Sequence, residues 1–238
     1  MQVTLSSYPN SHLRRMRKNA EVVQQSWIYR FAQIILSGLL SIVWRVRVFN
    51  RRHEPTDGGV LYVANHQSFL DPILVAFALQ RPMNFMARDS LFKNKYFSKL
   101  ISTFNAFPVK RGTGDIKAVK ESLRRLKDGH QLIVFPEGTR TDNGKIQPFK
   151  PGPALLAQRG ATWTVPVLID GAELVWPKNQ KFPTLGNIVV QYGEPIHQSV
   201  AKDLTPEELT ELLRNRLIEI QDAVRRRAGK STFDYNES

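Results

Sequence analysis

A histidine and an aspartate five residues apart form the pair in this sequence best suited to proton transfer. His66 and Asp71 lie in the segment 65–71, directly after an apolar run, Val60–Ala64, that predicts a strand. Ligand sites in open α/β sheets lie at the carboxyl ends of strands. A neutral imidazole can take a proton from a hydroxyl while a carboxylate fixes its tautomer. We therefore predict that His66 acts as a general base oriented by Asp71.

The local sequence must fold so that the two side chains meet. Pro72 follows Asp71, and the pair predicts a helix start with Asp71 as N-cap. On one continuous helix, residues five positions apart would point about 140° away from each other. Because the helix is expected to begin only at Asp71, the preceding turn can return the imidazole to the carboxylate. A capped helix after an ordinary turn is the alternative, so the pair needs support from other residues.

Two further segments with suitable side chains follow predicted strands. Phe-Pro-Glu-Gly-Thr-Arg at 135–140 supplies Glu137 and Arg140, and Phe-Pro-Val-Lys-Arg-Gly at 107–112 supplies Arg111. If the strands are parallel, their carboxyl ends meet at one edge of the sheet. A base, an acid and two guanidinium groups, whose planar forks match phosphate oxygens, would then converge.

Neighbouring residues have secondary expected roles. Gly138 lets the backbone approach a ligand closely. Lys110 ranks below Arg111, because adjacent side chains on a strand point to opposite faces. Glu137 has two open interpretations: it bonds to the substrate, or it pairs with an arginine and only holds the turn. Backbone donors near the His66 turn are expected to stabilise an oxyanion.

Short apolar runs alternate with amphipathic helical patterns from residue 46 onward. This alternation predicts an α/β fold with a mixed, mostly parallel sheet flanked by helices. A helix is predicted from Ile116 to a stop at Gly129, and another after a capping box at Thr205 and Glu208. The tail after Arg227 is expected to be frayed. Strands are predicted at 47–50, 60–64, 84–87, 106–109, 131–135, 165–169 and 188–192.

Composition and charge restrict the class of protein. The 238 residues, 42% hydrophobic and 23% charged, suit one folded α/β unit and exclude collagen-like or largely disordered chains. The lack of cysteine excludes a disulfide framework and a thiolate nucleophile and fits a reducing compartment. No motif implies a metal. The 34 Lys and Arg against 21 Asp and Glu give a net charge of +13, which predicts a polyanionic partner.

The basic charge is concentrated around an apolar run near the N-terminus. Residues 1–53 carry nine Lys and Arg and one Glu. A helix over the apolar run, residues 31–44, would be about 21 Å long, which is shorter than the bilayer core of roughly 30 Å. Its polar residues recur every three or four positions, and aromatic residues flank it. The polar positions are Arg30, Gln33, Ser37, Ser41 and Arg45.

We expect residues 1–53 to dock on a membrane as an amphipathic or re-entrant helix, and 54–238 to form the catalytic unit. A buried core helix with a basic flank is one alternative, and a complete transmembrane span is another. A nucleic-acid binding protein without catalysis would need basic residues interleaved with aromatic contacts over a face, so we expect no nucleic-acid partner. A hydrolase using the same His and Asp is a further alternative, and it would need no hydroxyl acceptor.

The order of these motifs resembles that of the glycerolipid acyltransferases, specifically the 1-acyl-glycerol-3-phosphate acyltransferases. The shared pattern is Asn-His-x4-Asp, a strand ending in an arginine, Phe-Pro-Glu-Gly-Thr-Arg, and Val-Pro-Val at 165–167, within roughly residues 26–195. Asn105 and Lys110 depart from the usual glycine and the often acidic residue of the second block. These departures bear on the acceptor headgroup more than on the reaction.

The resemblance implies acyl transfer from acyl-CoA or an acyl carrier protein to the hydroxyl of 1-acyl-sn-glycerol-3-phosphate, with no other cofactor. Another lysophospholipid or a lipidated amine is an alternative acceptor. The resemblance also implies that the protein lies at the cytoplasmic face of a membrane. The implied site residues are His66 and Asp71 for catalysis, Arg111, Glu137, Gly138, Thr139 and Arg140 for the acceptor phosphate, and Asn65, Lys110 and Pro166 in secondary positions.

Overall fold

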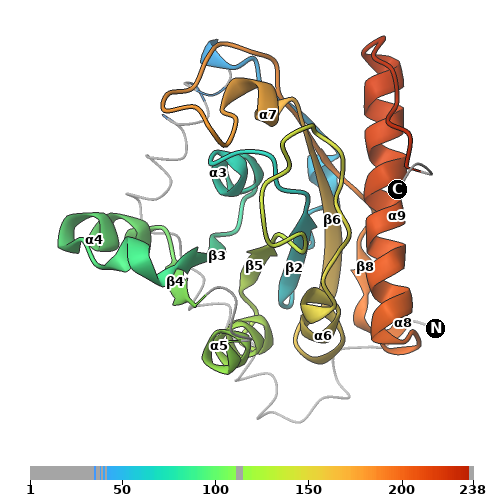
Figure 1. Ribbon diagram of the computed structural model, residues 1–238. Helices are drawn as coiled ribbons and strands as arrows, with labels where there is room; N and C mark the ends of the chain where they lie inside the picture. Colours follow the sequence, from blue (N-terminus) through green and yellow to red (C-terminus); the bar gives the residue numbers. More distant parts are fainter. Residues whose placement is uncertain (1–34, 36–37, 39, 41, 111–114, 236–238) are drawn as a thin grey trace.

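A mixed sheet runs through the part of the chain that the computed structural model describes, which is residues 35, 38, 40, 42–110 and 115–235 (Figure 1). The strand order is β1-β7-β6-β2-β5-β3-β4, and β8 pairs with β6. Strands β6, β2, β5, β3 and β4 are parallel, whereas β7 and β8 are antiparallel to β6. The strands are β1 (Arg47–Phe49), β2 (Val60–Ala64), β3 (Met83–Arg88), β4 (Ala106–Val109), β5 (Gln131–Val134), β6 (Trp163–Asp170), β7 (Val189–Tyr192) and β8 (Ile196–His197).

The predicted α/β class with a mostly parallel sheet is confirmed, and each predicted strand is present with small changes at its ends. β6 is longer than predicted. β8 was missed because a strand of two residues is too short to display an alternating pattern. β1 lies within the segment 1–53 and pairs with β7 in the same sheet.

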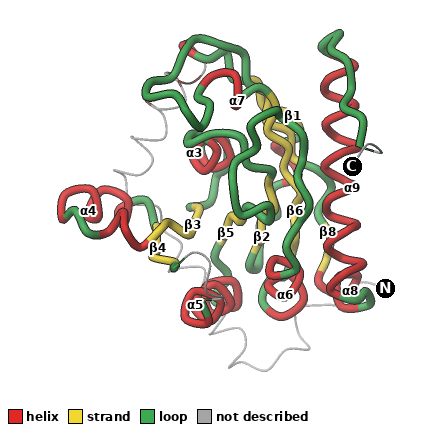
Figure 2. The backbone as a smooth tube through the Cα atoms, viewed as in Figure 1, coloured by secondary structure: helices red, strands yellow, loops and turns green. Residues whose placement is uncertain are grey.

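Helices lie on both faces of the sheet (Figures 1 and 2). β2 is buried on both sides, as its run of apolar residues predicts. Tyr62 belongs to the core cluster that contains Leu74 of α3. Val63 belongs to the opposite cluster, with Leu126 of α5 and Leu213 of α9. In the described residues the helices are α3 (Asp71–Ala76), α4 (Lys95–Thr103), α5 (Ile116–Lys127), α6 (Gly152–Arg159), α7 (Ala172–Val175), α8 (Gln198–Lys202) and α9 (Pro206–Arg227), with 3-10 helices η2 (Arg51–His53) and η3 (Asp89–Phe92).

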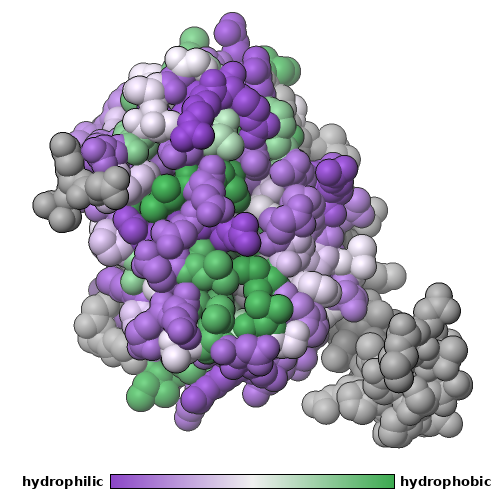
Figure 3. Space-filling model, turned by 90° about the vertical axis from the view of Figure 1, so that its right-hand side faces the viewer, coloured by the Kyte–Doolittle hydropathy of each residue, from purple (hydrophilic) through white to green (hydrophobic). Residues whose placement is uncertain are grey.

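Two of the predicted helices, α5 and α9, have the expected boundary signals. The Asp115 side chain caps α5 by accepting from the amides of the first turn, and Gly129 follows with a φ of 86°. α9 begins with the capping box of Thr205 and Glu208. Its outer side faces the viewer in Figure 3, where hydrophilic side chains cover most of the surface and apolar side chains gather in two places.

Few of the N-terminal residues that were predicted to dock on a membrane are described. Positions 35, 38, 40, 42 and 43 are helical. Leu40 is fully buried in the core, whereas Ile42 is 81% exposed. Of the five recurring polar positions named above, only Arg45 is described, and it lies beyond the helix with a φ of 40°. Within the described residues, no helix combines the length and the apolar character that a membrane crossing requires.

The predicted frayed tail is wrong for residues 228–235. They turn back along α9 after Gly229, whose φ is 67° (Figure 1). The Arg225 side chain donates to the Ser231 carbonyl at 2.7 Å, and the amide of Ile146 donates to the Tyr235 hydroxyl at 2.9 Å. The prediction failed because the tail has no apolar periodicity. Individual side chains and main-chain groups hold it instead.

Candidate active site

His66 lies just beyond the carboxyl end of β2, and its ring contacts the first residue of α3. Nδ1 of His66 is 2.7 Å from Oδ2 of Asp71, which is fully buried. The same oxygen accepts from the amides of Gln67 at 2.6 Å and Ser68 at 2.8 Å. An ionised carboxylate can only accept, so Nδ1 carries the proton and Nε2 is left as an acceptor. A general base needs this tautomer.

Asp71 differs from the prediction that it caps its helix. The helix begins at Asp71 itself, Leu70 occupies the N-cap position, and no side chain of the described residues caps the helix there. The carboxylate instead turns back to residues 66–68, because the imidazole and two amides of the tight turn donate to it. Asp71 thus holds the turn that presents His66.

Burial raises the pKa of the Asp71 carboxyl above its ordinary value, although the hydrogen bonds from His66 and from two backbone amides act in the opposite direction. The same exclusion of water reduces the screening between this carboxylate and a charged imidazole.

Glu137 follows β5, the parallel neighbour of β2, and contacts the His66 turn. One carboxyl oxygen accepts from the His66 amide at 2.9 Å, and the other accepts from the Gln147 amide at 3.4 Å. Burial raises the Glu137 pKa to about 8. The expected meeting of His66 and Glu137 at one sheet edge is thus observed. In the structure, Glu137 holds this turn through main-chain amides.

Arg140 lies beside the same turn. Its guanidinium carbon is 3.6 Å from the centre of the Phe69 ring, and Phe69 also contacts Trp176 with ring centres 5.5 Å apart. The next residue, Thr141, donates its amide to the His66 carbonyl at 2.8 Å. Between Glu137 and Arg140, Gly138 and Thr139 are exposed, and Gly138 has a φ of 73°. The segment 137–141 therefore wraps the His66 turn.

Arg111 lies outside the described residues, so its side chain is not placed. The strand before it, β4, is parallel to β2 and lies three strands away in the order β2-β5-β3-β4. At roughly 4.8 Å per strand this is about 14 Å across the same edge. Lys110 is exposed, and its amide donates to the Asp115 carboxylate at 2.9 Å.

Asn65 directly follows β2, and Pro166 lies within the neighbouring strand β6. The Asn65 side chain donates to the Ile169 carbonyl and accepts from the Ile169 amide, both at 2.8 Å, so it extends the pairing of β2 with β6. Pro166 pairs with Val63 and is buried within the sheet, three residues before Ile169 along β6. Asn65 therefore supports the edge, whereas Pro166 lies below it.

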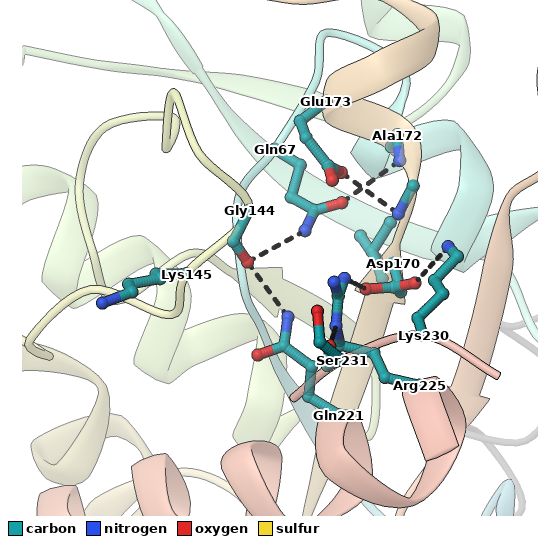
Figure 4. A network of polar contacts seen from close by, with 12 residues as sticks. Gln67, Gly144, Lys145, Asp170, Ala172, Glu173, Gln221, Arg225, Lys230 and Ser231 are labelled. Carbon is teal, nitrogen blue, oxygen red and sulfur yellow. Dashed lines mark hydrogen bonds and ion pairs between the residues drawn. The ribbon is translucent and has the colours of Figure 1, made fainter. Parts of the chain in front are cut away.

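Sequence reasoning missed several residues that shape the site. The Phe135 ring stacks on the His66 imidazole, with centres 4.3 Å apart. The Gln67 side chain accepts from the Ala172 amide at 3.2 Å and donates to the Gly144 carbonyl at 3.4 Å (Figure 4). Phe135 could have been noticed as the first residue of its motif. Gln67 gave no signal, because its partners lie 77 and 105 residues away.

The fold and the site define an α/β protein with a buried histidine–aspartate pair at the carboxyl edge of parallel strands. Residues 45–170 match the family model described as Acyltransferase. The chain belongs to the acyltransferase family and is an enzyme that transfers acyl groups.

Named relatives and a solved structure are consistent with this membership. A 1-acyl-sn-glycerol-3-phosphate acyltransferase of Bacillus subtilis (strain 168) is 29% identical over 200 residues, which are 82% of this chain and 98% of that protein. A chloroplastic 1-acyl-sn-glycerol-3-phosphate acyltransferase of Arabidopsis thaliana is 28% identical over 80% of this chain, but over only 52% of its own length. The crystal structure of the 1-acyl-sn-glycerophosphate acyltransferase PlsC of Thermotoga maritima has the same fold, with a TM-score of 0.69 and 23% identity over 92% of this chain and 85% of that one.

Proposed function

We propose that the protein transfers an acyl chain from the thioester of acyl-CoA or acyl carrier protein to the free hydroxyl of 1-acyl-sn-glycerol-3-phosphate, giving phosphatidic acid. The observation that carries this proposal is the His66–Asp71 pair, with Nδ1 committed to the buried carboxylate. The names of the relatives, one of which matches 82% of this chain, support the acceptor.

In the proposed reaction, Nε2 of His66 takes the proton of the acceptor hydroxyl as that oxygen attacks the thioester carbonyl. Asp71 stabilises the resulting imidazolium. The tetrahedral intermediate then expels the thiolate, which takes the proton from His66, so the enzyme returns to its starting state. Both substrates are bound together, and no acyl-enzyme forms.

The contacts of the His66 turn bear on which backbone donors near it can stabilise the oxyanion. The amides of residues 66–68 donate to Glu137 and Asp71, so they are already committed. We therefore assign stabilisation of the oxyanion to donors outside the His66 turn. This assignment follows because an N–H group directed at a carboxyl oxygen is not directed at the oxyanion.

We assign the acceptor phosphate to Arg140, with Gly138, Thr139 and Arg111. Arg140 supports this assignment because Phe69 holds its guanidinium beside the His66 turn. A guanidinium offers two parallel donors to phosphate oxygens. The positive net charge of the chain fits an anionic substrate.

We further propose that the protein docks on the cytoplasmic face of an anionic membrane through residues 1–53 and the loop 176–187. This loop exposes Phe182 by 69% and Leu185 by 79%, and it carries Lys178 and Lys181. Trp44 donates to the Thr184 carbonyl at 2.8 Å, which joins the loop to the N-terminal segment. Exposed apolar side chains beside lysines fit a lipid interface.

The test combines purified protein, anionic liposomes, a labelled acyl thioester and a panel of lysophospholipids. Labelled phosphatidic acid is expected with 1-acyl-sn-glycerol-3-phosphate, and His66→Ala is the inactive control. Preferential labelling of another lysophospholipid would reassign the acceptor. Release of free fatty acid without any acceptor would indicate a hydrolase, and retention of DNA without liposome binding would indicate a nucleic-acid binding protein.

A further inference from the structure

The turn that carries His66 is enclosed by the loop 141–147. At one end of this loop, the Thr141 amide donates to the His66 carbonyl at 2.8 Å. At the other end, the Gln147 amide donates to Glu137, whose second oxygen accepts from the His66 amide. The position of the His66 main chain therefore depends on this loop from both sides.

The middle of the loop is bonded to the catalytic turn and to α9 at a single carbonyl. The Gly144 oxygen accepts from Gln67 at 3.4 Å and from Gln221 of α9 at 3.0 Å (Figure 4). Both glutamine side chains are fully buried, and Gln67 is the residue next to His66. Gly144 thus connects α9 to the turn.

The next two residues of the loop are bonded to the C-terminal tail. Nζ of Lys145 donates to the Asp234 carbonyl at 2.8 Å, and the Ile146 amide donates to the Tyr235 hydroxyl at 2.9 Å. The Tyr235 hydroxyl in turn donates to the Gln221 side chain. Three consecutive loop residues, 144–146, are therefore held by α9 or by the chain beyond it.

The tail has its own attachment to the sheet. Asp170 at the end of β6 is 1% exposed, and its two oxygens accept from Arg225 at 3.2 Å and Lys230 at 3.1 Å (Figure 4). The Arg225 guanidinium also lies 4.1 Å from the centre of the Phe233 ring. A Cβ on Gly144 would come within 3.2 Å of the Phe233 ring, so the tail packs closely on the loop.

We propose that residues 228–235 act as a C-terminal strap, and that Gln221 and Tyr235 are positioning residues for the His66 turn. They hold loop 141–147, and the loop holds the imidazole where it meets the acceptor hydroxyl. A loop that depends on a few buried hydrogen bonds opens locally when they are removed. The proposal rests on the proposed reaction for its catalytic consequence, whereas the contacts themselves are independent of it.

The test compares Tyr235→Phe, and a chain ending at Ala228, with wild type and with Thr232→Ala as control. Tyr235→Phe keeps the ring against Arg214 and removes only the hydroxyl. Thr232 lies exposed on the same tail. Acyl transfer gives kcat and KM for both substrates, amide hydrogen exchange reports on residues 66–68 and 141–147, and thermal unfolding confirms that each chain is folded.

We expect kcat to fall roughly ten- to hundredfold in the shortened chain, and less in Tyr235→Phe, because a small misplacement of the base is costly. KM should change less than about twofold, since the substrate-binding groups keep their places, and exchange should accelerate at 66–68 and 141–147 but not in α5. Thr232→Ala should match wild type.

Unchanged amide hydrogen exchange at residues 66–68 and 141–147 in both variants would overturn the proposal that residues 228–235 act as a strap. A lower kcat without faster exchange, faster exchange with wild-type kcat, or a rise confined to KM would each overturn the positioning role. If wild type transfers no acyl group, the proposed function fails, and the exchange measurement still decides whether the strap holds the loop.

Discussion

Asp71 reaches back across the start of its own helix to His66, with Oδ2 at 2.7 Å from Nδ1. The same oxygen accepts from two amides of the intervening turn, so one buried atom shapes the turn and orients the ring. A helix with a conventional side-chain cap would have directed this carboxylate forward. The pairing of His66 with Asp71 therefore depends on the tight turn between them.

Removal of the imidazole tests the base directly. His66→Ala should lower kcat by about 10² to 10⁴, the usual contribution of a general base, while both substrates still bind. Rapid-quench kinetics and equilibrium binding measure the two effects separately. The control is His197→Asn, because His197 caps α8 and asparagine preserves a cap. Near-wild-type turnover in His66→Ala would exclude the mechanism.

Arg140 should act on the acceptor and not on the thioester. Arg140→Ala is expected to raise the acceptor KM roughly tenfold to a hundredfold, because a hydrogen bond to a charged group contributes about 1.5–3 kcal/mol. The KM for the thioester should stay within about twofold of wild type. Arg216→Ala, on the exposed side of α9, is the matched control. An unchanged acceptor KM would place the phosphate elsewhere.

Glu137 should make stability depend on pH. Its pKa is raised from 4.5 to about 8 by burial, so the folded protein keeps a proton that the unfolded chain loses. The resulting stabilisation is complete below pH 4.5 and is lost as the pH rises through 8. The slope is at most about 1.4 kcal/mol per pH unit.

Glu137→Gln has no titrating group at this position, so it removes the contribution of Glu137 to the pH dependence of the unfolding free energy. The unfolding free energy of wild type minus that of the variant should therefore decrease steadily with rising pH. Urea unfolding at a series of pH values across this window measures the difference. Parallel curves for the two proteins would show that Glu137 does not keep its proton.

The proposal that loop 176–187 docks on a membrane can be tested with single cysteines, because the chain contains none. An environment-sensitive dye on Phe182→Cys or Leu185→Cys should shift to shorter wavelength with anionic vesicles, and the shift should weaken with salt. Val200→Cys on α8 is the control, since Val200 is half exposed and the adjoining β8 pairs with the start of β6, at the opposite edge. Labels at 182 and 185 that stay in water on vesicle-bound protein would contradict the assignment.

Local sequence patterns were sufficient for the framework of the fold. Apolar runs marked each strand of the parallel core, and the capping box marked the start of α9. The carboxyl ends of parallel strands lie at one edge of the sheet. The meeting of His66 and Glu137 could therefore be predicted, because each residue follows a predicted strand. These inferences succeeded because periodicity, capping and strand polarity are properties of neighbouring residues.

The direction of individual side chains was decided by contacts between distant parts of the chain. Glu137 bonds to the amide of a residue 71 positions earlier, and Asn65 bonds across 104 positions. Tyr235 lies in a tail without periodicity and bonds 89 positions back to Ile146. No local pattern encodes such partners, because each buried polar group takes whichever donor or acceptor the packed elements bring to it.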